Sequence, residues 1–317
     1  MTYFSYDNFE KTDIQKKKRG RKMNHKTIKN PLIMVFTIYI FYYLLHILEY
    51  FVLRTDQTWV GEAIIHKLLG IIIMAIIACK LRISKNEIGF KNGKHLLYIL
   101  LGLAFGLGVF FIAYGAEFLL SLNSGNFKSL ELYVSAYAID SNIGNRTELI
   151  FFLICIIGNV VNVIMEEGNF RGLFLRILET KYSFVKSTVI SAILFGFWHV
   201  AGPIRNYVDG RQSLRGMIIT SLFMLVVSAL VGLKFTMLTR ITGSLYMSMS
   251  DHFVNNTIVN ILHVVTNTGA DELMTVRVCI AQTVSFLLVL IWYFMWSRQN
   301  ATYNEKQTGY RESCSYN

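Results

Sequence analysis

Charged residues are scarce in this chain, and proline is scarcer still. Only 16% of the 317 residues are Asp, Glu, Lys or Arg, where ordinary soluble domains have about 25%. This deficit, together with 53% hydrophobic residues, argues against two soluble domains and indicates a multi-pass membrane protein. The two prolines, Pro31 and Pro203, leave most apolar runs free to form unbroken helices. We therefore expect an all-α membrane protein.

Cysteine is also sparse. The four cysteines are far apart and form no C-x-x-C pair: Cys79, Cys155, Cys279 and Cys314. This spacing implies neither a disulfide framework nor a thiolate metal site. The first three lie in apolar stretches, where cysteine packs as a small hydrophobic residue.

Long apolar runs dominate the rest of the chain. A helix needs about 20 apolar residues to span a bilayer. Eight runs approach this length: 32–53, 62–79, 96–120, 148–167, 187–203, 216–238, 241–263 and 277–297. The second contains Glu62, His66 and Lys67, and the seventh is polar around Asp251. Because polar spans are shielded by neighbouring helices or line a cavity, we expect about eight transmembrane helices in a bundle with an intramembrane catalytic cavity.

Positive charge is concentrated outside the apolar runs. The net charge is +11, and nine Lys or Arg residues lie between positions 11 and 30, directly before the first run. No groove-reading motif accompanies them, so we expect no nucleic acid as a partner. A basic segment in this position is typical of a topology signal with affinity for anionic headgroups, which makes membrane lipids the expected partner.

The loops repeat this bias. Lys and Arg are most frequent in the loops on the side of the N-terminus, at 80–94, 171–186, 234–240 and 298–311. The positive-inside rule then puts both termini in the cytosol. We divide the chain into a basic cytosolic tail (1–30), a transmembrane domain (31–297, with its motifs in 148–260) and a cytosolic C-terminal tail (298–317). In the longest external loop, 121–147, the amphipathic stretch from Leu130 to Ile139 predicts a short interfacial helix.

The first of three polar clusters ends the fourth apolar run. Glu167 and Arg171 are four residues apart and share a helix face, while Glu166 points toward a different neighbour. One carboxylate can thus pair with the guanidinium while the other addresses a water or a metal. The alternative is a helix-end charge pair at the cytosolic interface.

The second and third clusters each place two residues one helical turn apart. Phe195 can pack beside His199, whose neutral imidazole is a base or a metal ligand. His252 and Asn256 can bind a metal or donate hydrogen bonds to an oxyanion. The alternatives are a packed aromatic pair for the former and an interhelical polar contact for the latter.

Taken together, the three clusters favour hydrolysis of an amide. Ionisable groups within the membrane are costly and mark functional sites. A base, a second base or ligand, and an oxyanion donor form a set suited to this reaction. The sequence contains no Gly-rich phosphate loop, no H-E-x-x-H and no nucleophile elbow.

The ordered set resembles the CPBP family of intramembrane proteases. This family includes CAAX prenyl endopeptidases and bacteriocin-processing or immunity proteins, also called the Abi family. Its pattern E-E-x-x-x-R, F-x-x-x-H and H-x-x-x-N/D matches Glu166-Glu167-x-x-x-Arg171, Phe195-x-x-x-His199 and His252-x-x-x-Asn256. The resemblance covers about residues 148–260.

The resemblance implies an endopeptidase that cleaves a membrane-associated peptide or a lipid-modified protein. It implies that Glu166 and His199 activate the water and that Glu167 and Arg171 orient Glu166. His252 and Asn256 would steady the oxyanion or complete a metal site. Zinc held by Glu166, His199 and His252 and a metal-free glutamate mechanism both stay open.

Two other functions are compatible with these residues. A non-catalytic immunity or scaffold protein of the same family would bind a toxin peptide or a membrane partner through the loop 121–147. A transporter could use the buried charges to carry a proton or an ion, but inverted repeats and paired broken helices are not evident in the sequence.

Overall fold

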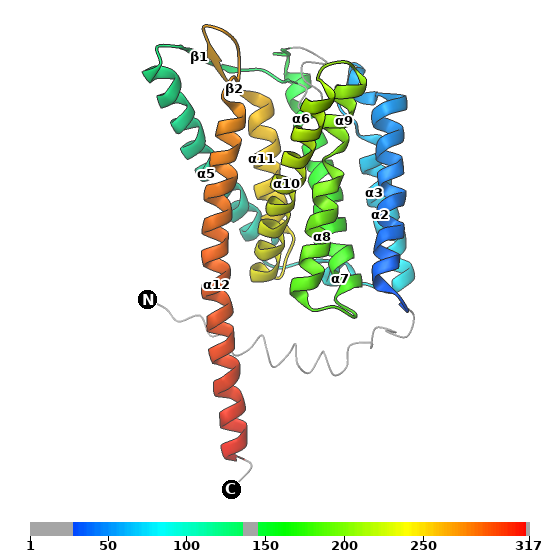
Figure 1. Cartoon of the computed structure of the whole chain (residues 1–317). Coiled ribbons are helices and arrows are strands. Elements are labelled where there is room, and N and C mark those ends of the chain that lie inside the picture. The colour runs from blue at the N-terminus through cyan, green and yellow to red at the C-terminus, as the bar shows by residue number, and fades with distance from the viewer. Residues whose placement is uncertain (1–27, 136–144, 315–317) are drawn as a thin grey trace.

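The structure is a computed structural model that describes residues 28–135 and 145–314, with side chains as far as residue 300. Most of the basic segment 11–30, residues 136–139 of the expected interfacial helix and the end of the C-terminal tail therefore lie outside the described residues. The helices α2, α3, α6, α8, α10, α11 and α12 run side by side as an upright bundle, with α5 inclined along one flank (Figure 1).

The elements follow one another along the chain as α2 (Pro31–Ile47), η2 (Leu48–Leu53), η3 (Thr55–Gln57), α3 (Ile65–Leu81), α4 (Lys85–Ile88), α5 (His95–Asn123), β1 (Phe127–Leu132), α6 (Leu149–Glu167), η4 (Gly168–Phe174), α7 (Leu175–Leu178), α8 (Phe184–Trp198), α9 (Ala201–Val208), α10 (Leu214–Thr242), α11 (Tyr246–Ile261), β2 (Leu262–Thr266) and α12 (Met274–Cys314).

Six helical segments of the described chain are long and apolar enough to cross a membrane: Pro31–Gln57, His95–Asn123, Leu149–Leu178, Phe184–Val208, Leu214–Thr242 and Met274–Asn300. The protein is therefore an integral membrane protein. The expected count of eight is not confirmed. The second and seventh runs form α3 and α11, which have 17 and 16 residues. At 1.5 Å per residue each is about 25 Å long, shorter than a hydrocarbon core of about 30 Å.

Helix α11 carries many polar side chains for a segment inside the bundle, and it is packed tightly against α5. A Cβ atom on Gly102 would lie 2.5 Å from the backbone oxygen of Met247, and one on Gly106 would lie 2.9 Å from Cβ of Val254. The absence of a side chain at these two glycines allows the close approach. Helix α11 is thereby held beside α5 and α6, as expected for a polar segment shielded by its neighbours.

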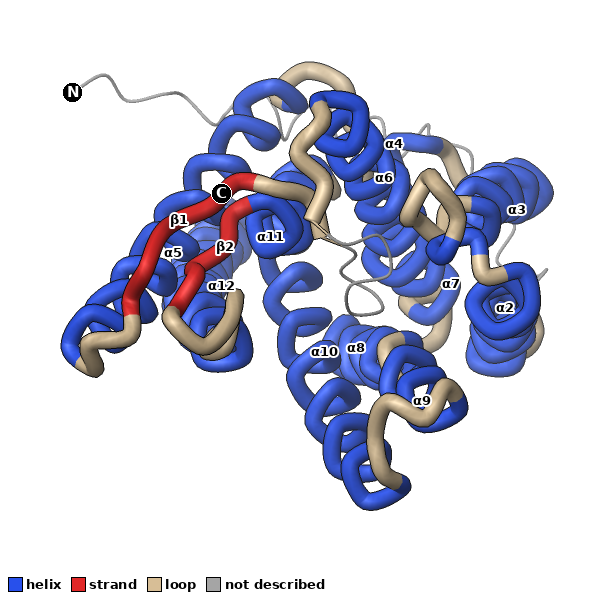
Figure 2. The backbone as a smooth tube through the Cα atoms, turned by 90° about the horizontal axis from the view of Figure 1, so that it is seen from above, coloured by secondary structure: helices blue, strands red, loops and turns tan. Residues whose placement is uncertain are grey.

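The described residues are mostly helical, as predicted, and a small two-stranded antiparallel sheet is the exception to the all-α prediction. Strand β1 pairs with β2, so that Leu130 lies opposite Val264 and Leu132 opposite Leu262. The sheet covers the end of the bundle beside α5, α11 and α12 (Figure 2). The interfacial helix expected from Leu130 is therefore wrong for the residues that form β1. The pairing gives hydrogen-bond partners to backbone groups of both segments, which an isolated short helix would leave to water.

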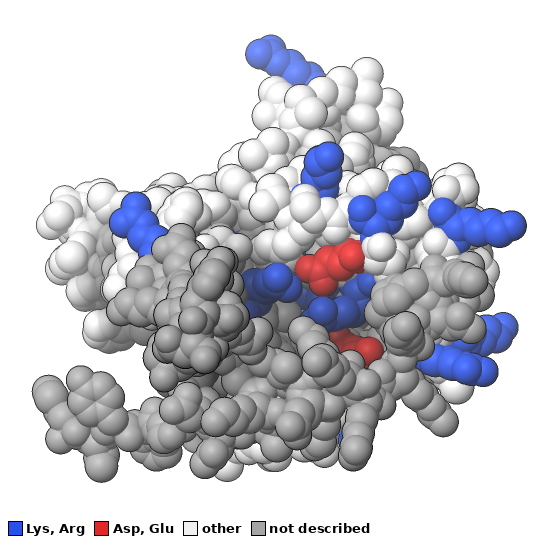
Figure 3. All heavy atoms as spheres, turned by 90° about the horizontal axis from the view of Figure 1, so that it is seen from below, with Lys and Arg blue, Asp and Glu red and all other residues white. Residues whose placement is uncertain are grey.

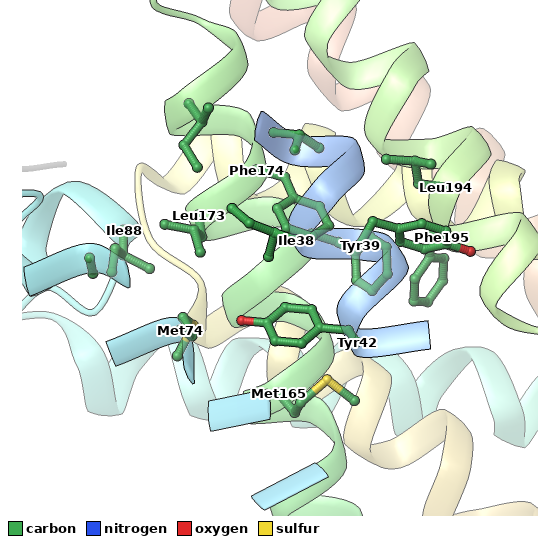
Figure 4. Packing of buried hydrophobic residues seen from close by; sticks show 14 of the residues in the cluster. Ile38, Tyr39, Tyr42, Met74, Ile88, Met165, Leu173, Phe174, Leu194 and Phe195 are labelled. Carbon is green, nitrogen blue, oxygen red and sulfur yellow. The ribbon is translucent and has the colours of Figure 1, made fainter. Parts of the chain in front are cut away.

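The largest hydrophobic cluster joins α2, α3, η4 and α8. It includes Met165, Phe170 and Phe195, which lie next to residues of the first two polar clusters. Figure 4 shows Tyr39 and Tyr42 of α2 packed toward Phe174 and Phe195. The ring centroids of Tyr39 and Phe170 are 6.3 Å apart, and those of Phe170 and Phe195 are 5.1 Å apart. This aromatic packing fixes α8 and η4 relative to each other.

Basic side chains gather at the end of the bundle where α3 and α7 finish. Exposed Lys and Arg residues in the last turn of α3 and in the segments that follow α3 and α7 include Lys80, Arg82, Lys85, Lys91, Lys181 and Lys186. Figure 3 views this end and shows Lys and Arg distributed around it. This distribution of basic side chains agrees with the excess of Lys and Arg predicted for the loops on the side of the N-terminus.

Candidate functional site

The two glutamates lie at a change of helical geometry. Glu166 and Glu167 are the last residues of α6, which continues without a break into the π-helical turn η4. Such π turns are rare and frequently occur at functional sites, because the wider turn redirects the following side chains. Arg171 lies within this turn, and the exposed fractions of Glu166, Glu167 and Arg171 are only 5%, 0% and 2%.

Arg171 is held by one carboxylate and two aromatic rings. Its Nη1 atom lies 3.0 Å from Oε1 of Glu167, so the predicted pairing of these residues is present. The guanidinium carbon lies 3.9 Å from the ring centroid of Phe195 and 5.3 Å from that of Phe235. A buried ion pair requires good geometry, and here the guanidinium is held between the carboxylate of Glu167 and two aromatic rings, so the position of Glu167 is fixed as well.

His252 lies between the two glutamates. Its Nδ1 atom is 2.9 Å from Oε1 of Glu167, and its Nε2 atom is 3.5 Å from Oε2 of Glu166. Since an ionised carboxylate only accepts hydrogen bonds, Nδ1 carries a hydrogen and donates it to Glu167. The imidazole also stacks on Phe235, with ring centroids 4.8 Å apart. The ring orientation of His252 is therefore fixed by contacts on its edge and on its face.

Glu166 has one strong donor and one free oxygen. Trp198 donates its indole N–H to Oε1 of Glu166 across 3.1 Å. The other oxygen, Oε2, is buried and has no hydrogen-bond partner among the described residues. Sequence reasoning missed Trp198, although a buried tryptophan N–H usually finds a partner and this residue directly precedes His199 in the second cluster.

His199 lies at the end of α8 and is half-buried. Its Nδ1 atom is 2.8 Å from the backbone oxygen of Phe195, and the two rings of this pair are 4.6 Å apart, edge to face. The predicted packing of Phe195 against the imidazole is present. A carbonyl oxygen only accepts, so Nδ1 carries the hydrogen and Nε2 is left as the acceptor. The described contacts of Glu166 are with Trp198 and His252, not with His199.

Asn256 lies one turn after His252 on α11 and is half-buried. Its side-chain oxygen accepts a hydrogen bond of 2.9 Å from Nδ2 of Asn255. The oxygen is thereby engaged within the protein, and the amide nitrogen is the atom left for a ligand. An amide N–H₂ is a suitable donor to a developing oxyanion.

Sequence reasoning also missed a buried ion pair behind α11. The Nζ atom of Lys234 lies 2.8 Å from Oδ2 of Asp251, and both side chains are at most 3% exposed. Lys234 had been assigned to a cytosolic loop by its charge; that assignment is wrong, because it is inside α10 and buried. The signal that could have found the pair is Asp251 itself, an acid in an apolar run that required a cationic partner.

The predicted zinc ligands, Glu166, His199 and His252, come from α6, the end of α8 and α11. Among the described residues, no group of three or more His, Cys, Asp or Glu side chains is arranged to hold a metal ion. Glu166 and His252 face each other, and His199 donates Nδ1–H to the backbone of Phe195, which leaves its Nε2 for a ligand. Zinc at Glu166, His199 and His252 stays a prediction.

The N-terminal helices complete the wall around Trp198. The ring of His46 on α2 lies 4.4 Å from that of Trp198 and 4.6 Å from that of His66 on α3. His66 is fixed in turn, because its Nδ1 atom lies 2.7 Å from Oε2 of Glu49. Residues well before the three sequence clusters therefore hold the indole that donates to Glu166.

Comparison with known families identifies the central part of the chain. Residues 148–258 match the family model described as type II CAAX prenyl endopeptidase Rce1-like. The match spans α6 to α11 and includes all three polar clusters. For these residues, the match agrees with the family predicted from the motifs. The chain matches no curated protein and no solved structure.

Proposed function

We propose that this chain, a member of the CAAX prenyl endopeptidase family through residues 148–258, is an intramembrane endopeptidase that uses Glu166 to activate water. Its proposed substrate is a membrane-associated peptide or a lipid-modified protein. The proposal rests on the geometry between Glu166 and His252 more than on any other observation.

Two acceptors face each other at this point. We propose that His252 acts as the neutral imidazole with its hydrogen on Nδ1, so that Nε2 presents a lone pair to Oε2 of Glu166, which lies 3.5 Å away. Two acceptors repel unless hydrogen lies between them. A water molecule that donates one hydrogen to each would satisfy both atoms and direct its own lone pairs outward. We propose that this water is the nucleophile.

The reaction then proceeds as general acid–base catalysis. Glu166 accepts a proton from the water as the water oxygen bonds to the scissile carbonyl carbon, which gives a tetrahedral oxyanion. The oxyanion collapses, the carbon–nitrogen bond breaks, and the proton held on Glu166 passes to the leaving nitrogen. General bases of this kind contribute about 10²- to 10⁴-fold in rate. Trp198 holds the carboxylate in place through Oε1.

The remaining residues of the site have supporting roles in this proposal. Glu167, held by Arg171, fixes the tautomer of His252. Asn256 donates its amide N–H to the oxyanion, and His199, with Nε2 free to accept, is the second base of the site. These roles follow from the donors and acceptors that each side chain leaves unused.

The experiment is peptide cleavage by the purified protein in lipid nanodiscs. Farnesylated and unmodified peptides of the same sequence serve as substrates, and products are identified by mass spectrometry. We expect Glu166→Gln to lower kcat by at least 10²-fold without change in the thermal unfolding midpoint. The control is Lys186→Gln on the exposed basic end, which keeps full activity. Equal turnover by Glu166→Gln and wild type would overturn the mechanism.

Two further assignments are proposals checked on the same sample. Metal analysis beside the activity assay tests the predicted zinc. The orientation, with the basic end and both termini in the cytosol, follows from the exposed lysines there. Labelling of single cysteines introduced at Lys85 and at Asn267 with an impermeant maleimide, in intact cells, distinguishes the two faces.

A further inference from the structure

A chain of hydrogen bonds runs from Lys234 on α10 to Asn256 on α11. Nζ of Lys234 donates to Oε1 of Gln282 on α12 across 3.3 Å. Nε2 of Gln282 donates to Oδ1 of Asn255 across 2.6 Å, and Nδ2 of Asn255 donates to Oδ1 of Asn256 across 2.9 Å. Three side-chain amides are thus connected in series behind the site.

The direction of this chain is set at its first member. The ammonium of Lys234 has three donors and no acceptor, so the atom of Gln282 that faces it must be the oxygen. The nitrogen of Gln282 then faces Asn255 and requires the oxygen of that amide. The nitrogen of Asn255 in turn requires the oxygen of Asn256. Each amide therefore has one permitted orientation.

Lys234 is itself firmly held as the origin of the chain. It pairs with Asp251 at 2.8 Å and donates to the hydroxyl of Ser285 at 3.2 Å. Its exposed fraction is 1%. A carboxylate buried at this depth requires a cationic partner, and Lys234 is that partner for Asp251. Its positive charge is thus a fixed reference for the amides.

We propose that Lys234, Gln282 and Asn255 are positioning residues that orient the amide of Asn256, with its nitrogen toward the scissile carbonyl. An asparagine amide turned by half a rotation presents oxygen in place of nitrogen at nearly the same position. That oxygen would repel an oxyanion instead of stabilising it. This inference rests on the proposed function, and it extends the catalytic machinery to α12, beyond the segment that matches the family.

The decisive substitution is Gln282→Glu, which reverses the direction of these hydrogen bonds while the volume of the side chain stays nearly constant. A carboxylate accepts from Lys234 and also accepts from Asn255, so the amide of Asn255 must turn and offer its oxygen to Asn256. Asn256 then turns its nitrogen inward and its oxygen to the substrate. We expect kcat to fall by about 10²- to 10³-fold, the effect of losing an oxyanion donor, with KM nearly unchanged.

The matched control is Gln299→Glu, the same substitution on the same helix at an exposed position. It should leave kcat unchanged. The stronger readout is the pair of variants Asn256→Ala and Asn256→Ala/Gln282→Glu. If Gln282 acts only through Asn256, the second substitution has no further effect on kcat once Asn256 is removed.

The outcomes separate the two proposals. Loss of kcat in Gln282→Glu that vanishes on the Asn256→Ala background supports the positioning role. Unchanged kcat in Gln282→Glu, or a loss that adds fully to that of Asn256→Ala, overturns it, the latter because general misfolding would act independently of Asn256. If Asn256→Ala alone keeps full kcat, the oxyanion role fails together with this inference, while the role of Glu166 stands on its own test.

Discussion

The Nδ1 atom of His252 lies 2.9 Å from Oε1 of Glu167, a contact between residues 85 positions apart in the chain. The same carboxylate oxygen lies 3.0 Å from Nη1 of Arg171. One oxygen atom therefore joins the charge of η4 to the imidazole of α11. In the proposed mechanism, this shared oxygen keeps the hydrogen of His252 on Nδ1. The other ring nitrogen, Nε2, is then the acceptor that faces Glu166.

The first prediction concerns Glu167, which both balances the charge of Arg171 and orients the imidazole of His252. Glu167→Gln removes the carboxylate that pairs with the buried Arg171, and breaking a buried pair in this way typically costs about 3–5 kcal/mol. We expect a marked fall in the thermal unfolding midpoint and in kcat. Thermal unfolding in nanodiscs and peptide cleavage measure the two effects.

The double variant Glu167→Gln/Arg171→Met is the matched test. Replacing both members of a buried pair by neutral groups is often nearly neutral in stability, so the unfolding midpoint should recover. The activity should stay low, because an amide can present either oxygen or nitrogen to His252 and no longer fixes its tautomer. Recovery of activity along with stability would show that Glu167 serves the fold alone.

The second prediction concerns Trp198, whose indole N–H donates to Glu166. Trp198→Phe keeps an aromatic ring against His46 and removes this donor. Hydrogen bonds to charged groups are worth about 1.5–3 kcal/mol, so we expect kcat to fall by about 10- to 100-fold. The control Trp292→Phe alters an exposed ring on α12 and should not change turnover. A Trp198→Phe enzyme with wild-type kcat would remove the indole from the mechanism.

Short-range spacing predicted the contacts that lie within one helix. Glu167 with Arg171 and Phe195 with His199 are each four residues apart, and both pairs make contact. The prediction held for Arg171 even though its turn is π-helical, because residues four apart still share one side of the helix.

Contacts between helices could not be read in this way. His252 approaches both glutamates because α11 packs against α6, and no spacing in the sequence fixes that register. The 3.5 Å approach of His252 to Glu166 is one such contact, and the role of His199 in activating the water stays a prediction. Lys234 was misread for a related reason, since a charge at the end of an apolar run resembles a loop residue until its partner Asp251 is known.

The sheet was missed because its two strands are separated by about 130 residues. Leu130 pairs with Val264, and each strand is too short to be distinguished by periodicity alone. The predicted count of eight transmembrane helices is not confirmed, because α3 and α11 are only marginally long enough to span a membrane. Both errors concern segments whose structure depends on neighbours instead of on local sequence.

The third prediction tests how closely α10 must approach the site. A Cβ atom on Gly232 would lie 3.1 Å from Nη2 of Arg171 and 3.3 Å from Cδ1 of Phe195. Because both neighbours are themselves tightly packed, Gly232→Ala should displace the guanidinium and destabilise the fold by about 1–3 kcal/mol. Thermal unfolding and kcat should both decrease.

Gly108→Ala provides the comparison for this variant. Gly108 lies on α5, and a Cβ atom added there would meet no atom of a neighbouring segment within 4 Å. Alanine in a helix is favoured over glycine by about 0.5–1 kcal/mol. That variant should be as stable as wild type or slightly more stable, and fully active. If the two glycine variants behave alike, the close approach of α10 to Arg171 is not needed.

The fourth prediction concerns acid stability at the end of the bundle that bears the sheet. Asp271 accepts hydrogen bonds from His263 and from Arg277, the latter at 3.0 Å. Burial alone would raise the pKa of Asp271, but the hydrogen bond from His263 and the charge of Arg277 outweigh it and hold the pKa below its ordinary value. The ionised form is therefore favoured by folding.

The sign of the pH dependence follows directly. A lowered pKa in the folded state stabilises the protein above the unfolded value of about 3.9, and this contribution is lost as the pH falls through the folded pKa. Asp271→Asn should thus lower the unfolding midpoint at pH 7, and its deficit should shrink as the pH falls below about 4. Glu131→Gln, at an exposed carboxylate of β1, should lower the midpoint little at either pH. A deficit of Asp271→Asn that stays constant from pH 7 to pH 3 would mean that shape, and not the charge of Asp271, holds α12 to the sheet.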